Sequence, residues 1–126
     1  MNKIIFRTTL VLAMAALLTV CGCGKKADAS KPIPEVQAEA QKMDASQLRD
    51  TVMAYKDAIA DKAAKIKDEG MKLKDIPPAD LMAGKGKDIT AQIDELKKTV
   101  DALTERYKIY LDELKKKGGD LSGLQI

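Results

Sequence analysis

Residues 88–114, DITAQIDELKKTVDALTERYKIYLDEL, decide the fold. Apolar residues recur in this stretch at alternating steps of four and three, and charged residues fill most of the positions between them. The apolar stripe consists of Ile89, Ile93, Leu96, Val100, Leu103, Tyr107, Tyr110 and Leu114. This heptad spacing is typical of a helix that buries one narrow edge against another helix, as in a coiled coil. We therefore expect a long helix here that needs a partner helix.

A second stretch with the same spacing lies earlier in the chain and provides that partner. Asp44 or Ser46 can cap the start of a helix, because their side chains accept hydrogen bonds from unpaired backbone N–H groups. Its apolar stripe consists of Leu48, Val52, Tyr55, Ile59, Ile66 and Leu73. Pro77 and Pro78 end the helix, because proline cannot continue the backbone hydrogen-bond ladder.

The two stripes have nearly equal length and are joined by a connector of residues 77–87. Matched helices with a short connection form an antiparallel hairpin, so the predicted fold class is all-α. Folding the chain at the connector places Leu73 near Ile89. The same register places Tyr55 beside Tyr107 and Tyr110, so the sequence predicts one aromatic cluster at the open end of the hairpin.

Residues 34–118 are predicted to form this helical hairpin domain, with a short additional helix at the start. The segment PEVQAEAQKM, residues 34–43, has helix-forming composition and enters at the open end, where the apolar face of the last helix is widest. A two-stranded hairpin buries little surface alone and needs a third partner. The rival cover is a second copy of the protein. Residues 119–126 are predicted to be a flexible tail, although Leu121, Leu124 and Ile126 are available to dock.

The first residues, MNKIIFRTTLVLAMAALLTV, have the layout of a signal peptide. Lys3 and Arg7 form a basic start, and the apolar run that follows is shorter than the roughly 20 residues that a membrane span needs. A basic start, a short apolar core and a junction of small residues are typical of a secretory signal. We therefore assign residues 1–22 to a signal peptide and exclude them from the fold.

The motif Val20-Cys21-Gly22-Cys23 resembles the lipobox of bacterial lipoproteins, in which an aliphatic residue and a small pair precede a cysteine. The resemblance implies that Cys23 is lipidated, for example with palmitate, and becomes the first residue of the mature chain; Cys21 is the alternative. Residues 23–33 would then be a polar tether between the lipid and the fold. In the sorting convention of enterobacterial lipoproteins, Gly24 after the cysteine favours the outer membrane over the inner one.

Few residues are suited to catalysis or to metal binding. The chain has no histidine, and the Cys-Gly-Cys spacing does not fit a zinc set. It has 22 basic and 19 acidic side chains, and two of the basic ones belong to the signal peptide, so the remainder is nearly neutral and does not favour nucleic-acid binding. We expect no enzyme activity, no cofactor or metal and no small-molecule substrate.

One further feature lies in the connector, where Leu81 and Met82 are placed at the point farthest from the anchor. Apolar residues at an exposed tip can contact a partner, or they can fold back onto the stripe. Together these features indicate a lipid-anchored, periplasm-facing protein of the cell envelope with a structural or protein-interaction role. Its partner would be an unknown envelope protein or the chain itself. The alternative function is a periplasmic chaperone-like binding module or an accessory subunit of an envelope complex.

Overall fold

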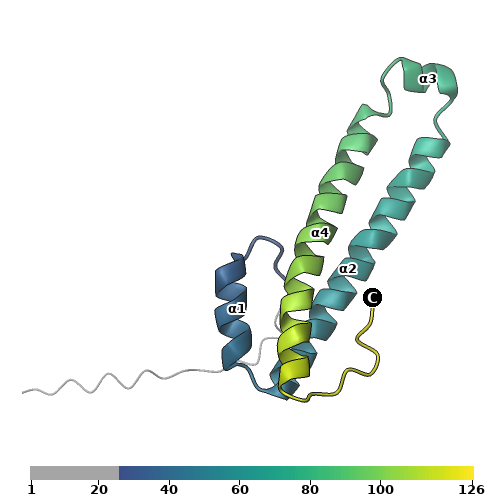
Figure 1. Ribbon diagram of the computed structural model, residues 1–126. Helices are drawn as coiled ribbons and strands as arrows, with labels where there is room; N and C mark the ends of the chain where they lie inside the picture. Colours follow the sequence, from purple (N-terminus) through teal and green to yellow (C-terminus); the bar gives the residue numbers. More distant parts are fainter. Residues whose placement is uncertain (1–25) are drawn as a thin grey trace, which may run out of the picture.

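The computed structural model describes residues 26–126, which contain four helices (Figure 1). The helices are α1 (Ile33–Lys42), α2 (Ala45–Lys74), α3 (Pro78–Met82) and α4 (Lys87–Lys116). Helices α2 and α4 run antiparallel along each other, α1 packs on α4 at the open end, and the short α3 closes the far end. We call the open end the base and the α3 end the tip. The predicted all-α hairpin with a short additional N-terminal helix is confirmed.

The ends of the long helices follow from local chemistry. The Asp44 side chain accepts a hydrogen bond from the Gln47 backbone N–H at 2.8 Å, and the Gln47 side chain accepts one from the Asp44 backbone N–H at 3.2 Å. This reciprocal pair is a capping box, which satisfies two backbone donors at the start of α2. Helix α2 ends ahead of Pro77, and α4 is followed by Gly118, whose φ of +66° is readily adopted only by glycine.

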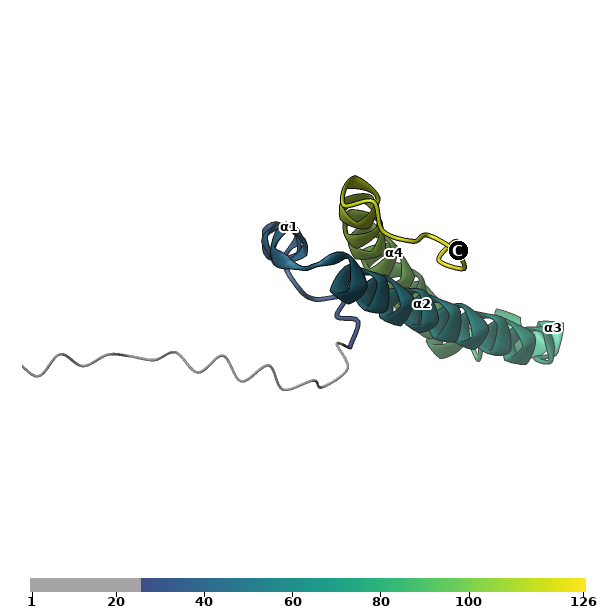
Figure 2. The same cartoon turned by 90° about the horizontal axis from the view of Figure 1, so that it is seen from below.

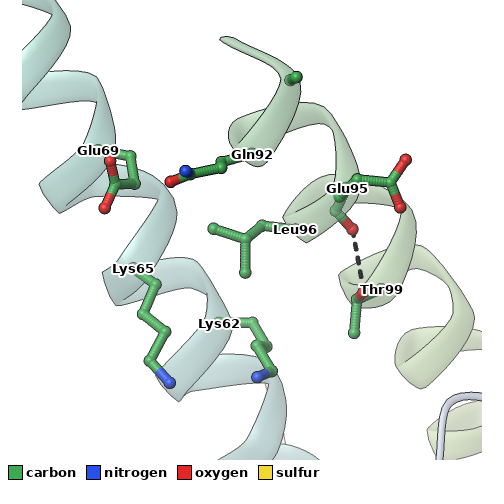
Figure 3. Close-up of a pocket in the computed structure, with 8 residues that line it drawn as sticks. Lys62, Lys65, Glu69, Gln92, Glu95, Leu96 and Thr99 are labelled. Atoms are coloured by element: carbon green, nitrogen blue, oxygen red, sulfur yellow. Dashed lines mark hydrogen bonds between the residues drawn. The ribbon is translucent and has the colours of Figure 1, made fainter. Parts of the chain in front are cut away.

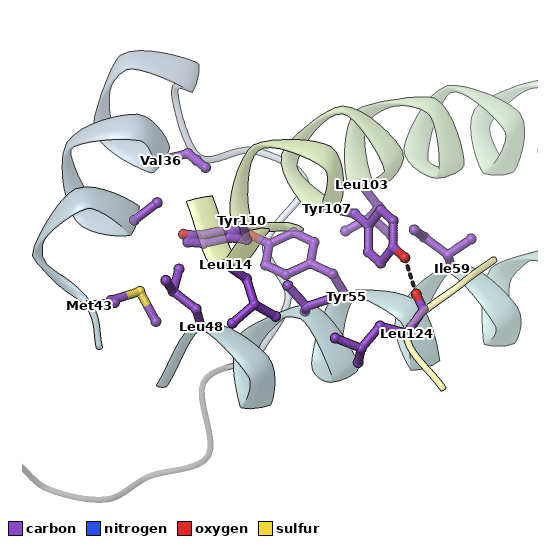
Figure 4. Close-up of a cluster of buried hydrophobic side chains, with 12 residues drawn as sticks. Val36, Met43, Leu48, Tyr55, Ile59, Leu103, Tyr107, Tyr110, Leu114 and Leu124 are labelled. Atoms are coloured by element: carbon purple, nitrogen blue, oxygen red, sulfur yellow. Dashed lines mark hydrogen bonds between the residues drawn. The ribbon is translucent and has the colours of Figure 1, made fainter. Parts of the chain in front are cut away.

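The core lies entirely at the base (Figure 4). Its buried apolar members are Val36, Ala40, Met43, Leu48, Val52, Tyr55, Ile59, Leu103, Tyr107, Tyr110, Leu114 and Leu124. The rings of Tyr55 and Tyr110 lie 5.4 Å apart between centroids at an angle of 39°, a tilted contact that adds to the energy of burial. The predicted aromatic cluster therefore exists, and it lies at the base as expected.

The C-terminal tail packs against the hairpin, in contrast to the expected flexible segment. Leu124 is only 1% exposed, and the Tyr107 hydroxyl donates a hydrogen bond to its carbonyl. Arg49 donates to the carbonyls of Asp120 and Ser122 at 2.6 and 3.1 Å, and Lys56 donates to that of Gly123 at 2.5 Å. The glycine pair after α4 turns the chain back, so that the tail covers one side of the seam between α2 and α4.

The N-terminal segment also packs on the hairpin rather than forming a free tether. The Tyr55 hydroxyl donates to the Asp28 carbonyl at 3.2 Å and accepts from the Asp28 N–H at 3.3 Å. The Arg106 guanidinium donates to the Lys31 carbonyl through Nε at 2.8 Å and Nη2 at 2.5 Å. These contacts hold residues 28–31 against both long helices. The two candidate lipidation sites, Cys21 and Cys23, lie outside the described residues.

The distal half of the seam, toward the tip, is covered much less. Six of the predicted stripe residues there are only half-buried, namely Ile66, Leu73, Ile89, Ile93, Leu96 and Val100. The apolar stripe of such a helix is wider than a single neighbouring helix covers. At the base, α1, residues 28–31 and the tail supply the missing cover. In the distal half α2 and α4 have only each other.

Candidate functional site

The part of the chain that the structure describes holds no group of three or more histidine, cysteine, aspartate or glutamate side chains placed to bind a metal ion. Within residues 26–126, none of the helices is both long and apolar enough to cross a bilayer. Every buried side-chain nitrogen or oxygen of these residues has a hydrogen-bond partner.

A groove between α2 and α4 in the distal half has a volume of about 640 Å³ (Figure 3). We call it the distal groove. Its lining residues are Lys62, Lys65, Glu69, Ala91, Gln92, Glu95, Leu96 and Thr99. Leu96 points between the two helices and forms the apolar floor, while Lys62 and Lys65 approach from α2. The groove is thus apolar at its centre and charged at its edges.

The distal groove lies on the same side of the hairpin as the N-terminal segment. Residues seven apart share a face of a helix, because two turns bring the chain back to nearly the same direction. Lys62 therefore lies on the face of α2 that carries Tyr55, and Thr99 lies on the face of α4 that carries Arg106. Tyr55 and Arg106 hold residues 28–31. At the base these residues therefore cover the side of the hairpin that is left uncovered at the distal groove.

Charges are ordered along the α2 edge of the groove. Lys62 and Lys65 lie nearer the base, and Glu69 lies nearer the tip. Lys65 is paired within α2 with Asp61 at 3.1 Å, and Glu69 accepts from Lys72 at 2.6 Å, which raises the pKa of the Lys72 ammonium. The Lys65–Asp61 pair is exposed and therefore weak, whereas the Glu69 side chain is only 18% exposed beside Lys72. The α2 edge therefore presents positive charge followed by negative charge in the direction of the tip.

At the tip, Leu81 and Met82 differ: one folds back onto the apolar stripe, and the other is exposed to a partner. A Cβ atom built on Gly86 would lie 2.8 Å from a methyl carbon of Leu81 and 2.8 Å from one of Leu73. Leu81 thus folds back onto the end of the seam, although 40% of it stays exposed. Met82 is 91% exposed and projects from α3. Only Met82 is fully available to a partner.

The polar contacts under α1 were not anticipated from the sequence. Lys31 forms an ion pair and hydrogen bond with Glu39, which raises the pKa of the Lys31 ammonium, and the Tyr110 hydroxyl lies 3.3 Å from the same carboxylate. Arg106 is 7% exposed, and its Nη1 donates to the Ala102 carbonyl at 2.7 Å. The sequence feature that could have identified Arg106 is its position directly beside the apolar stripe. A basic residue there can extend its charged head over the seam to unpaired carbonyls.

The buried tyrosines predict unfolding at alkaline pH. Burial raises the pKa values of the Tyr107 and Tyr110 hydroxyls above their ordinary value of 10.0, and the Glu39 carboxylate adds to the shift of Tyr110. The unfolded chain therefore loses these protons first as the pH rises past 10, and stability falls by up to about 1.4 kcal/mol per pH unit for each tyrosine. Circular dichroism and tyrosinate absorbance should change together above that pH. Ionisation of Tyr107 or Tyr110 while the helices stay intact would contradict this.

Comparisons with known proteins find no matching family model, no matching curated protein and no matching solved structure.

Proposed function

We propose that this chain is a lipid-anchored protein of the bacterial cell envelope with a structural or protein-interaction role and no catalytic one. The observation that carries the proposal is the Val20-Cys21-Gly22-Cys23 motif placed directly after a short apolar leader. Acyl chains on Cys23 would bind the bilayer firmly, because each buried CH₂ contributes roughly 0.8 kcal/mol and two or more chains make the attachment stable. Gly24 favours the outer membrane, with the hairpin in the periplasm.

The geometry of the base is compatible with this anchor. Four residues lie between Cys23 and Asp28, so the five steps from one Cα atom to the next span at most about 18 Å. Asp28 is fixed to Tyr55 by two hydrogen bonds. A lipid on Cys23 would therefore keep the base close to the bilayer. The tip lies at the other end of helices about 45 Å long.

Exposure of the tip favours a second candidate, a periplasmic binding module or an accessory subunit of an envelope complex. Met82 is an unbranched and polarizable side chain that adapts to different surfaces, and it is 91% exposed. In this case the anchor is the same, but the tip would contact the client. The two candidates differ in whether binding requires Met82.

The anchor is tested by a Cys23→Ser substitution in the full chain, produced in a bacterium supplied with radiolabelled palmitate. We expect the unaltered chain to carry the label and to sediment with membranes. The Cys23→Ser chain should carry no label and should lose membrane attachment, because the acyl chains supply most of the membrane affinity.

Cys21→Ser is the matched control, since it alters the same motif two residues earlier and should keep both the label and the membrane fraction. Loss of the label in Cys21→Ser alone would move the modification to Cys21. Absence of label from the unaltered chain would reject the lipoprotein proposal.

A further inference from the structure

We propose that the distal groove is the contact surface for a second copy of this chain, which packs on it in the antiparallel direction. The inference supplies a partner for the interaction role proposed above. It does not depend on the lipid anchor, because every residue that carries it lies within the described part of the chain.

The first support is continuity of the seam. The heptad stripe runs without a break along α4, and Leu103 and Leu114 at the base are 3% and 0% exposed. Leu96 has the same chemistry and the same stripe position but is only half-buried. At the base, α1, residues 28–31 and the tail form a third layer over α2 and α4. Among the described residues, none forms such a layer over the distal half. Two hairpins packed face to face form four helices around a shared core, which supplies that layer.

Shape sets the direction of the second copy. Helix α1 packs on α4 at the base (Figure 2), on the side that residues 28–31 occupy. The distal groove opens on the same side, so α1 forms a step at the base end of the groove. A copy running in the same direction would bring its own α1 against this one and hold the two grooves apart. In a copy that runs in the opposite direction, the tip lies beside α1 of the first copy, so that the two distal grooves can pack face to face.

Charge complements the same arrangement. A twofold axis near the middle of the groove brings Lys65 opposite Glu69 of the second copy, and Glu69 opposite Lys65 of the second copy. Both residues line the groove on α2; the side chain of Lys65 is 54% exposed, and that of Glu69 is 18% exposed beside Lys72. The axis also brings the two Leu96 side chains together at the centre. The central residues of the groove thus match each other across the axis, as a twofold interface requires.

The size of the contact predicts a weak dimer. The open part of the seam runs from residue 88 to about residue 100 of α4, or roughly 20 Å at the rise of an α-helix. With two helices about 20 Å wide side by side, such an overlap buries on the order of 400 Å² per copy, below the standard size of stable interfaces. Association should therefore depend on protein concentration.

Site-specific photocrosslinking in the full chain tests the pairing. A photoreactive phenylalanine derivative replaces Gln92 at the groove, and in a control chain it replaces Asp94, which lies two residues on and points to the far side of α4. We expect a species of twice the chain mass from the Gln92 chain and none from the Asp94 chain. Peptide mapping should place the crosslink on α4 of the second copy, close to Thr99 and Val100.

A charge exchange tests the orientation without disturbing the core. Lys65→Glu alone and Glu69→Lys alone should each reduce the crosslinked fraction about fivefold, because two symmetry-related pairs change from attraction to repulsion. The double variant should restore crosslinking. Circular dichroism of each variant confirms that the helices persist.

Three outcomes would overturn the inference. A crosslink that maps to α2 near Glu69 of the second copy would mean that the copies run in the same direction. A crosslink to a different protein, or no crosslink at all, would remove the second copy as occupant of the groove. The membrane fraction of the same cells reports on the anchor separately, so failure of the dimer and failure of the anchor can be distinguished.

Discussion

A Leu114→Ala substitution should lower the free energy of unfolding by about 3 kcal/mol, in the range for a fully buried leucine. Leu114 is 0% exposed and packs among the residues of the base core. It also lies under the turn that returns the tail, since a Cβ atom on Gly119 would lie only 2.1 Å from a Leu114 methyl carbon. Truncation leaves a cavity that these close-packed neighbours cannot fill. Urea unfolding followed by circular dichroism measures the change.

Leu96→Ala is the matched control, because it removes the same atoms from the same stripe of α4. Leu96 is half-buried and lines the distal groove, so its truncation should cost only about 1 kcal/mol. The comparison is made at concentrations low enough to keep the chain monomeric. Equal losses for Leu96→Ala and Leu114→Ala would mean that the two halves of the seam are equally covered, contrary to the fold described above.

A Leu124→Asp substitution should lower the free energy of unfolding by about 3 kcal/mol, because it removes a buried leucine and places a carboxylate in an apolar site. Leu124 is 1% exposed, and its carbonyl accepts the hydrogen bond of the Tyr107 hydroxyl. Release of the tail limits the loss, since the chain can expose the aspartate by giving up the tail contacts. Urea unfolding gives the energy, and limited proteolysis of the tail shows its release.

Ile126→Asp tests the same tail at a position that is 62% exposed. Its effect should stay below about 0.5 kcal/mol, as for most surface substitutions. If Leu124→Asp were equally mild, the tail would contribute nothing to the stability of the base, and the flexible tail expected from the sequence would be the better description.

The hairpin could be predicted because its two stripes carry strong, local and repeated signals. Heptad spacing in residues 88–114 identified one helix, and the matched spacing from Leu48 to Leu73 identified its partner. The proline pair at 77–78 fixed the turn between them. The register then followed from the equal lengths, and it brought Tyr55 to Tyr110 as observed.

The packing of the two ends of the chain could not be predicted in the same way. The tail is held by one buried leucine, by an ion pair between Asp120 and Arg49 at 3.1 Å, and by backbone carbonyls that accept from Arg49 and Lys56. Backbone carbonyls are the same in every sequence, so the hydrogen bonds to them leave no signal in the sequence of the tail. The same holds for the Lys31 carbonyl, which accepts from Arg106.

The distal groove was missed for a different reason. Charged residues on a long helix usually form a solvated face, so Lys62, Lys65 and Glu69 give no signal of a groove in the sequence. These residues line a groove because α1 and the tail cover the seam only at the base. The stripe predicts which residues are apolar along the whole hairpin. It does not predict where a third layer ends.

The attachment of residues 28–31 also determines how the molecule would carry a mechanical load. Tension applied to the chain before residue 26 reaches the Asp28 and Lys31 bonds before it reaches α1. Tyr55 belongs to α2 and Arg106 to α4, so the force divides between both long helices beside the aromatic cluster. The ten-residue α1 is thereby shielded from strain. Under tension the hairpin should therefore move as one rigid body, because the force enters at its most densely packed region, instead of unfolding from its end.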